Sequence, residues 1–333
     1  MVRSFEVRKT RKGDNFGSAR INLGHNGDFA EVDAKIWALD GLLGEGQPVP
    51  AAGDVLEIDY KEDAYQGRPQ YVIRRFRRLE GEERLQALES FRPPDRIDRA
   101  FYRDRLEQLI EATSPERASG QVLRLIYDQA GFRETFFAAP AATHHHQNYP
   151  GGLLEHTLNV TSVALSIAET YAGPTGLSFN CRRLFIDRDV LVVAGLLHDI
   201  GKIHTHELAP LPQLTEANHW EGHLARTYAW VRREAEPYLE APPYPEAVDE
   251  IHKLLHCILA HHGSLEYGSP VTPACAEAFI LAQADLTDAR LADIAEAARE
   301  AFERDAEARW LPRRFHFPGG LFVGDWRTRE DLP

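Results

Sequence analysis

Histidines and aspartates recur in the second half of the chain, where helices are predicted to end or to face the interior. His198 and Asp199 are adjacent and follow an apolar run, and His261 and His262 close a second predicted helix. Asp285 takes a position on an Ala-rich helix where an apolar residue would normally lie. A carboxylate next to a histidine at a helix end can bridge two metals while the histidine binds one. Because imidazole and carboxylate ligands together suit Mn, Fe, Zn or Co, these residues predict a metal site.

The apolar stripes of the predicted helices direct further histidines toward the same interior. His156 lies one turn before the stripe of residues 157–171, and His219 and His223 are expected on one face of a third helix. Burial of a polar or charged group is costly unless the group is paired or binds a metal. One inward-facing histidine is usually a hydrogen-bonded core residue. Four helices that each bring a His or an Asp to an apolar face favour a metal site instead.

Helices are predicted for most of the chain after residue 81. Apolar residues recur with helical spacing over residues 82–91, 96–112, 121–132, 157–171, 190–197, 247–262 and around residues 278–285. We expect a helical connector over residues 81–140, an all-α bundle that holds the histidines over residues 141–305, and a loosely packed tail over residues 306–333. His204 and His206 are expected in a solvated loop.

Residues 1–80 have a different pattern, of short strands separated by turns. Residues 29–39 alternate between apolar and polar types, and Asn26-Gly27 just before them is a strong hairpin signal. Residues 55–60 and 70–76 are predicted to be further strands. Several short strands without a convincing helix indicate a small β-barrel of the OB type. The expected fold class is therefore multidomain α+β, with an N-terminal OB-like barrel followed by an all-α helical bundle.

Barrels of this type bind single-stranded nucleic acid by stacking bases on exposed aromatic rings beside basic side chains. Five residues of this N-terminal part could form such a surface: Trp37, Tyr65, Arg68, Tyr71 and Arg74. The alternative is a purely structural role, since most strand aromatics belong to a core and arginines at strand ends are usually solvated. We expect single-stranded RNA or DNA as the partner of this surface.

The distribution of charge is compatible with such a partner, although the net charge of the 333 residues is −13. Lys and Arg strengthen binding to the phosphate backbone of a nucleic acid. Residues 1–80 contain 13 Lys/Arg and 13 Asp/Glu, so the whole acidic excess lies in residues 81–333. His25 is the only histidine before residue 81, and the other 14 follow it. Two parts of such different composition are expected to have different roles.

No association with a membrane is expected. The N-terminal sequence lacks the apolar stretch of a secretory signal, and the longest clean apolar run, residues 190–197, is too short to cross a bilayer. Cys181, Cys257 and Cys275 are widely spaced and form no CxxC pair. We therefore expect a protein of the reducing cytoplasm without a disulfide framework. Assembly into a homo-oligomer stays open.

The order His…His-Asp…His…His…Asp resembles the HD-domain phosphohydrolase superfamily. The stretches GGLLEHTLNV, AGLLHDIGK, LLHCILAHHG followed by SPVTP, and ADLTDA are similar to one branch of it, the YhaM-type 3′→5′ exoribonucleases. In that branch an OB-fold precedes an HD domain, and the similarity runs from about residue 3 to about residue 300. The resemblance implies a metal-dependent enzyme that removes nucleotides from the 3′ end of single-stranded RNA.

The resemblance also implies roles for individual residues. It makes four side chains ligands of a first metal: His156, His198, Asp199 and Asp285. Asp199 would bridge to a second metal held by His223 and His261, with His262 as a rival or additional ligand. Lys202, in the HDIGK stretch, matches a lysine beside the scissile phosphate, so that Asp199 and Lys202 are the catalytic candidates. Manganese is the expected metal, with Fe, Co, Zn or Mg as alternatives.

Hydrolysis of a phosphodiester is the reaction that such a site predicts. Two metals about 3.5–4 Å apart lower the pKa of a bridging water and hold the attacking and leaving oxygens. Attack on the 3′-terminal phosphorus would release a nucleoside 5′-monophosphate, while Lys202 offsets charge in the transition state. One alternative is an HD-domain hydrolase of a small nucleotide or cyclic nucleotide, with the barrel as an accessory element. Another is a nucleic-acid-binding protein whose HD domain is inactive.

Overall fold

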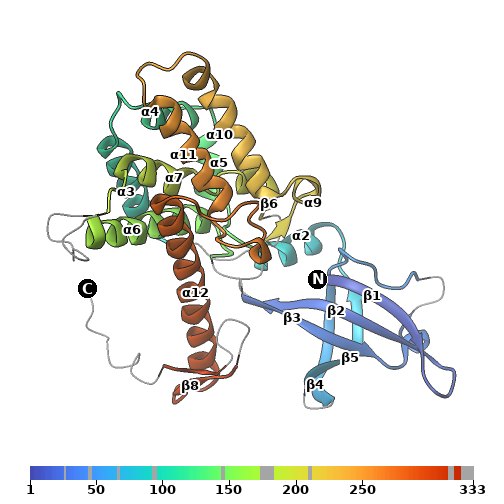
Figure 1. Ribbon diagram of the computed structural model, residues 1–333. Coiled ribbons are helices and arrows are strands. Elements are labelled where there is room, and N and C mark those ends of the chain that lie inside the picture. Colours follow the sequence, from blue (N-terminus) through green and yellow to red (C-terminus); the bar gives the residue numbers. More distant parts are fainter. Residues whose placement is uncertain are drawn as a thin grey trace. The chain divides into compact units, whose positions relative to one another are not determined.

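The computed structural model describes residues 1–25, 28–43, 47–65, 68–91, 96–143, 147–172, 184–208, 212–313 and 319–323. The chain divides into two compact units. Residues 1–94 belong to the first unit, and residues 95–208 and 212–333 belong to the second. Figure 1 shows that the first unit is built from strands and the second from helices. None of the helices in these ranges is long and apolar enough to cross a membrane.

The first unit is a mixed sheet of five strands. The strands are β1 (Val2–Lys9), β2 (Asn15–His25), β3 (Asp28–Ile36), β4 (Leu56–Tyr65) and β5 (Arg68–Arg78), in the order β1-β2-β3-β5-β4. Neighbours are antiparallel except β3 and β5, which are parallel. Val2 N–H donates to Asp54 O (2.8 Å) and Gly53 N–H donates to Val2 O (2.9 Å), so hydrogen bonds also join β1 to the segment before β4. This sheet is consistent with an OB-like domain.

The alternating pattern of residues 29–39 predicts the buried face of β3 correctly. Ala34 and Ile36 are fully buried, and Val32 packs on the same cluster. The strand ends at Ile36, however, and Leu39 begins the short helix α1 (Leu39–Leu42). Residues 37–39 are therefore not part of the strand that was predicted to include them, because the buried Leu39 is supplied by a helical turn instead.

The hairpin predicted at Asn26-Gly27 is supported by the two strands that flank it. β2 and β3 are antiparallel with His25 opposite Asp28, while Asn26-Gly27 lies outside the described residues. The predicted strands at residues 55–60 and 70–76 correspond to β4 and β5. The sequence gives no clear signal for β1, because Val2 is the one buried residue of that strand.

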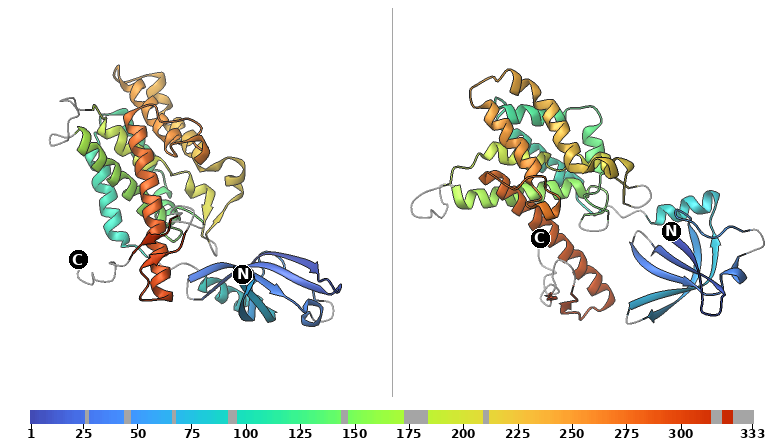
Figure 2. Two further views of the ribbon diagram at one scale, coloured as in Figure 1. Left: turned by 60° about the horizontal axis from the view of Figure 1, so that its bottom comes forward. Right: turned by 45° about the vertical axis from the view of Figure 1, so that its right-hand side comes forward.

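The second unit is helical. Its helices are α3 (Arg99–Ala112), α4 (Ala118–Tyr127), α5 (Phe132–Ala138), α6 (Gly152–Ala172), α7 (Arg188–Leu197), α8 (Lys202–Thr205), α9 (Glu216–Trp220), α10 (Gly222–Glu240), α11 (Ala247–Ala260) and α12 (Ala276–Arg304). Residues 190–197 of α7 are all buried, and α4, α6, α11 and α12 contact that helix. Figure 2 shows these helices from two further directions. The core of this unit therefore surrounds α7.

Glycines divide two segments that were predicted as single helices. Residues 121–132 do not form one helix, since α4 ends at Tyr127 and Gly131 adopts a φ of +78° before α5. His219 lies on α9 and His223 on α10, because Gly222 between them has a φ of +70°. Positive φ suits glycine and ends a helix. The prediction that His219 and His223 share one helix face is therefore wrong.

His204 and His206 do not lie in a loop, so that part of the prediction is wrong, although the side chain of His204 is exposed as expected. His204 belongs to α8, and its ring centroid lies 5.3 Å from that of Trp230. His206 belongs to the strand β6 (His206–Glu207), which pairs with β7 (Gln213–Leu214). Burial, with a smaller effect from the charge of Lys202, lowers the pKa of His206 to about 4. His206 is therefore a half-buried part of the second unit, whereas His204 contacts Trp230 but is exposed.

The packing of the helices bears on the domain boundaries. α2 (Gly81–Ser90) falls in the first unit, whereas α3, α4 and α5 contribute buried residues to the same core as α6 and α7. Within the predicted tail, β8 (Trp310–Leu311) pairs with β9 (Leu321–Phe322), and the buried Leu311 and Val323 pack on Ala297 and Ala298 of α12. The division at residues 80, 140 and 305 stays a prediction, because shared packing does not reveal which segments fold independently.

Candidate metal centre

His198 and Asp199 follow directly on α7, whose residues 190–197 are buried on all sides. His198 Nδ1 donates to Gly195 O (2.8 Å), which leaves Nε2 as the nitrogen that faces the site. Gly195 approaches α6 so closely that a Cβ on it would lie 2.6 Å from Thr161 Oγ1. This close approach of the α7 backbone to Thr161 brings α6, which carries the first histidine of the motif, next to the end of α7.

One group of potential metal ligands consists of His156, His198 and Asp199, whose ligand atoms lie within 4.8 Å of one another. All three side chains are buried. The Nε2 atoms of the two histidines are 3.3 Å apart, and each lies 3.4 Å from Asp199 Oδ2. Asp285 of α12 completes the group, with Oδ1 3.2 Å from His156 Nε2. The structure thus brings together the four residues expected around a first metal.

Asp288 lies behind His156 and is a residue that the sequence analysis missed. Its Oδ2 accepts hydrogen bonds from His156 Nδ1 (2.7 Å) and from Gln147 Nε2 (2.9 Å). A carboxylate on Nδ1 fixes the tautomer in which the lone pair of Nε2 points at the site, as is usual behind metal-binding histidines. Asp288 follows Asp285 by three residues on α12. Their shared helix face was the signal available in the sequence.

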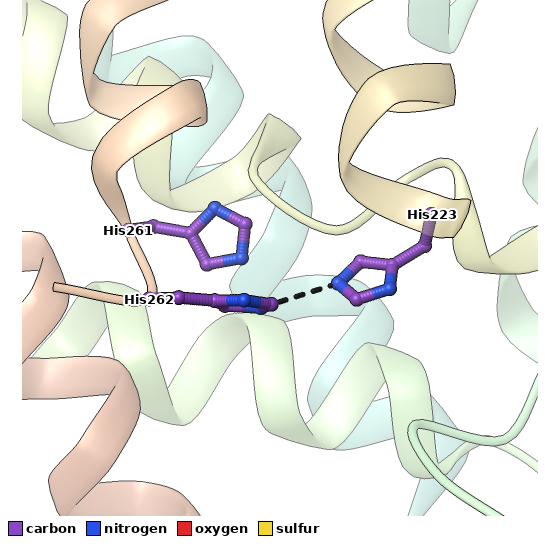
Figure 3. Close-up of side chains that lie close together, drawn as sticks. All are labelled: His223, His261 and His262. Carbon is purple, nitrogen blue, oxygen red and sulfur yellow. Dashed lines mark hydrogen bonds between the residues drawn. The ribbon is translucent and has the colours of Figure 1, made fainter. Parts of the chain in front are cut away.

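A second group consists of His223, His261 and His262, whose ligand atoms also lie within 4.8 Å of one another. Figure 3 shows these rings converging from the start of α10 and from the end of α11. His223 Nε2 lies 3.3 Å from His262 Nε2, and His261 Nδ1 donates to Ile258 O (2.7 Å). Asp199 Oδ1 lies 3.3 Å from His223 Nε2 and 3.6 Å from His261 Nε2. Asp199 therefore faces one group with each carboxylate oxygen.

The centre contains polar atoms that the described residues do not satisfy. Asp199 Oδ1 and His261 Nε2 are buried and make no hydrogen bond. Such atoms are rare in folded proteins because an unpaired buried polar group is costly. Imidazole nitrogens together with carboxylate oxygens are donors that divalent transition metals accept. The residues present therefore fit divalent metal ions.

Lys202 brings a cation to the same centre. It is the buried first residue of α8, and its Nζ lies 2.6 Å from Asp199 Oδ2. The position of α8 depends on Gly201, whose N–H donates to Thr227 Oγ1 of α10 (2.9 Å). A Cβ on Gly201 would lie 2.4 Å from His223 O. A contact between backbones thus sets the interval between Asp199 and His223.

Burial and neighbouring charges decide the protonation of these ligands. Burial raises the pKa of Asp199, but Lys202 and the nearby histidines outweigh burial and keep that pKa well below its usual range. The pKa of Asp285 is lowered too, because its interaction with a histidine overcomes burial. Burial lowers the pKa of His223 well below normal and that of His262 to about 4. Ionised carboxylates and neutral imidazoles are the forms that bind metals.

Burial lowers the pKa of His261, but its interaction with Asp199 outweighs burial and raises that pKa above its usual range. His156 is affected in the same direction. Burial lowers its pKa, but hydrogen bonds with Asp199, Asp285 and Asp288 outweigh burial and raise the pKa well above its usual range. The negative field that favours a proton on this ring favours a metal cation equally. Metal ions displace such protons when they bind. The charge around His156 is therefore suited to a cation.

Trp37 is the exposed aromatic residue among the candidates for contact with nucleic acid. Its side chain is 49% exposed, and its ring stacks on that of Phe16 with centroids 5.0 Å apart. Lys35 Nζ lies 5.7 Å from the centroid of the Phe16 ring. Two stacked rings beside a cation form a surface on which a base can stack.

The other candidates lie on β4 and β5. Arg74 is exposed, whereas Tyr71 is half-buried and packs on the core of the sheet. Tyr65 and Arg68 are paired opposite each other, and their side chains are outside the described part of the structure. The half-buried Tyr71 agrees with the structural alternative, in which strand aromatics belong to the core.

Comparison with known families concerns the unit that holds the histidines. Residues 153–290 match the HD domain. The matched segment lies within the second unit and contains both groups of potential ligands. Asp285, Asp288 and Lys202 are also part of it.

Curated relatives match over most of the chain. The 3′-5′ exoribonuclease YhaM of Listeria monocytogenes serotype 4b (strain CLIP80459) is 27% identical over 270 residues, which cover 78% of this chain and 75% of the relative. The proteins of the same name from Listeria innocua serovar 6a and Bacillus subtilis (strain 168) are 29% and 26% identical over the same shares. These matches confirm the resemblance predicted from the motifs. No solved structure matches the chain significantly.

Proposed function

We propose that this chain is a metal-dependent 3′→5′ exonuclease that hydrolyses single-stranded RNA and releases nucleoside 5′-monophosphates. The observation that carries the proposal is the convergence of two ligand groups on Asp199, with Asp199 Oδ1 and His261 Nε2 buried and unsatisfied. Relatives named 3′-5′ exoribonucleases supply the class of reaction. Single-stranded DNA is a further substrate to be tested.

Two divalent metal ions are the proposed cofactors, with manganese first and Fe, Co, Zn or Mg as alternatives. The first would be held by His156, His198, Asp199 and Asp285. The second would be held by Asp199, His223 and His261, with His262 as an additional ligand. When bound, such ions lower the pKa of a water molecule and offset phosphate charge.

The chain's own residues orient the ligands and balance charge. Asp288 holds the His156 ring so that Nε2 is directed at the centre. The Lys202 ammonium, 2.6 Å from Asp199, lies where it can offset negative charge that builds up on phosphoryl oxygens. Because α7 is buried on all sides, water is excluded from one side of the centre, which strengthens these electrostatic interactions.

We further propose that the first unit holds RNA upstream of its 3′ end. The hydrogen bonds that join the start of β1 to the segment before β4 support a partly closed barrel of the OB type. Exposed Trp37, stacked on Phe16, offers a ring for base stacking, and Lys35 offers a cation. The remaining proposed contacts are Tyr65, Arg68, Tyr71 and Arg74.

A panel of substrates tests the proposal. With Mn²⁺, a 5′-labelled single-stranded RNA should become shorter from its 3′ end, and nucleoside 5′-monophosphates should accumulate. A single-stranded DNA of the same sequence, 5′-nucleotides and cyclic dinucleotides are tested beside it. Preference for one of the small nucleotides would replace the proposal with a small-nucleotide hydrolase. Binding of RNA without hydrolysis of any substrate by the metal-loaded protein would indicate an inactive HD domain.

A further inference from the structure

A cavity of the second unit, separate from the metal ligands, has the size of a small-molecule site. It lies between the turn that joins α4 to α5, the helix α8 and the helix α10, and its volume is about 680 Å³. Sites for small molecules have volumes of roughly 300–1,000 Å³. None of the residues that line this cavity is a proposed metal ligand.

Aromatic rings form one wall of the cavity. The rings of His204 and Trp230 lie with centroids 5.3 Å apart at an angle of 36°. Trp230 is held in turn by an edge-on contact with Phe132, at 5.5 Å and 84°. Trp230 Nε1 is buried and has no hydrogen-bond partner among the described residues. Because this N–H is buried, Trp230 can contribute the surface of its ring to the cavity but not a hydrogen bond.

Cationic side chains complete the polar lining. Arg226 and Arg233 of α10 line the cavity, and each is paired with a carboxylate: Arg226 Nη1 donates to Glu221 (2.8 Å) and Arg233 Nη2 donates to Glu234 (2.7 Å). A guanidinium carries several donors, so Arg226 can keep this ion pair and still donate to a ligand. The remaining N–H donors of both guanidinium groups are suited to the oxygens of a phosphate. The aromatic wall favours an anion that also carries a flat ring.

The cavity adjoins the elements that build the metal centre. Arg226 follows His223 by three residues on α10, and His204 follows Lys202 by two residues on α8. Groups for the metal centre and groups for the cavity therefore come from the same short helical segments. A ligand of the cavity would lie beside the site of hydrolysis.

We propose that this cavity binds a nucleotide, with the base against Trp230 and His204 and a phosphate at Arg226 and Arg233. The nucleotide has two sources. It is either a residue of the RNA chain near the 3′ end, in which case the inference rests on the proposed function, or a free nucleoside 5′-monophosphate. Stacking and the guanidinium groups serve both in the same way.

Two variants of the full-length protein test the proposal. Trp230→Leu removes the ring and the N–H, and Arg226→Gln removes a cation without touching the core. Trp220, which is 80% exposed on α9, supplies the matched control Trp220→Leu. Thermal unfolding and metal content are measured for each variant, because Trp230 also packs on the core. The readouts are KM and kcat for a short single-stranded RNA and affinity for 5′-AMP.

Loss of base stacking should raise KM for RNA, or Kd for 5′-AMP, by roughly 10-fold in Trp230→Leu. The kcat for that RNA should stay within about twofold of wild type, because the residues of the metal centre are unchanged. A higher KM for RNA alone identifies a residue of the RNA chain, and weaker binding of 5′-AMP alone identifies a free nucleotide. Unchanged values of both in folded Trp230→Leu and Arg226→Gln would overturn the proposal. Failure of the wild-type protein to degrade RNA refutes the proposed function but leaves the comparison with 5′-AMP valid.

Discussion

Asp199 is the residue on which both ligand groups depend, because each of its carboxylate oxygens faces one of them. Asp199→Asn should therefore abolish hydrolysis and greatly reduce the bound metal, while leaving the fold intact. Asp104→Asn, at an exposed position of α3, is the matched control. Metal analysis and turnover on the same samples check this expectation. Near-normal metal content and activity in Asp199→Asn would show that the site is assigned to the wrong residues.

Asp288 acts through His156 and provides a separate test. Asp288→Asn should weaken metal affinity by roughly 10- to 100-fold, because the histidine loses the carboxylate that orients it. Excess metal should restore most of the activity, since the proposed ligands themselves are intact. A titration of activity against metal concentration measures both effects. Activity that excess metal does not restore would point to a role of Asp288 in the fold instead.

Lys202 should influence the rate more than the binding of substrate. Removal of its charge by Lys202→Met should lower kcat by roughly 10²-fold with little change in KM, because charge on the phosphoryl oxygens increases in the transition state. Single-turnover cleavage is measured together with metal content, since Lys202 Nζ also contacts Asp199. A parallel loss of metal would mean that Lys202 acts by holding Asp199. A wild-type rate would remove it from the catalytic candidates.

The residues of the centre differ in how far the sequence reveals them. His198-Asp199 and Asp285 could be singled out, because a polar side chain on an apolar helix face needs a partner. For Asp288 the sequence gives only the helix face that it shares with Asp285, and it does not reveal the partner of this carboxylate. Its partner His156 lies 132 residues away, so the contact depends on how α6 and α12 pack. Long-range packing of this kind cannot be obtained from local spacing.

At the scale of elements, a charged network fixes three helices around the core. Arg117 at the start of α4 pairs with Asp187 at the start of α7 (2.6 Å) and with Glu250 of α11 (2.9 Å). Glu250 Oε1 accepts from Ser119 N–H (2.8 Å), and Oε2 accepts from Tyr244 Oη (2.6 Å). α7 and α11 end at the metal centre, so this network holds the two helices that deliver ligands.

Glu250→Gln should destabilise the protein by about 2 kcal/mol near neutral pH, because a buried charged acceptor is lost. Burial raises the pKa of Glu250, but hydrogen bonds from Ser119, Tyr244 and Arg117 outweigh burial and lower that pKa. A carboxyl with a lowered folded-state pKa stabilises above its unfolded pKa, and this contribution is lost as the pH falls through the folded-state pKa. The difference in free energy of unfolding between wild type and Glu250→Gln should therefore become smaller under acidic conditions.

Urea unfolding at several pH values measures this difference in free energy of unfolding. Glu240→Gln, at an exposed position, is the control. A difference between wild type and Glu250→Gln that does not change with pH would contradict the proposed charge dependence. The same difference in the Glu240 variant would show that the effect is not specific to the network.

The helices themselves were predictable to the extent that their apolar pattern is regular. α6, α7 and α11 lie close to the predicted residues, because their buried faces repeat with helical spacing. The breaks at Gly131 and Gly222 were not predicted, since glycine inside an apolar pattern is compatible with a continuous helix. Whether such a glycine adopts a positive φ depends on its packing against other parts of the chain.

At the scale of the whole molecule, we expect the first unit to bind RNA and the second unit to hydrolyse it. A chain that begins at Asp95 keeps α3, α4 and α5, and should fold and hydrolyse bis-p-nitrophenyl phosphate at about the wild-type rate. Its activity on long single-stranded RNA should fall by roughly 10-fold or more, because the stacking surface is missing. A chain that begins at Ala141 should not fold, since it lacks the buried Leu106, Leu123 and Phe136. Circular dichroism tests whether each shortened chain folds, and kinetics measure its activity on both substrates. An equal loss of activity on both substrates would mean that the first unit is only a structural support.

The contact of Gly201 with α10 has a consequence for the choice of ion. The interval between Asp199 and His223 is set by one backbone against another, and such a contact does not yield as a flexible side chain does. If the distance between the ligands is fixed, the centre binds ions of a matching radius better than others. It does not adjust this distance to fit the most abundant ion. We therefore expect ion selectivity to depend on Gly201, which is not a metal ligand and has no side chain.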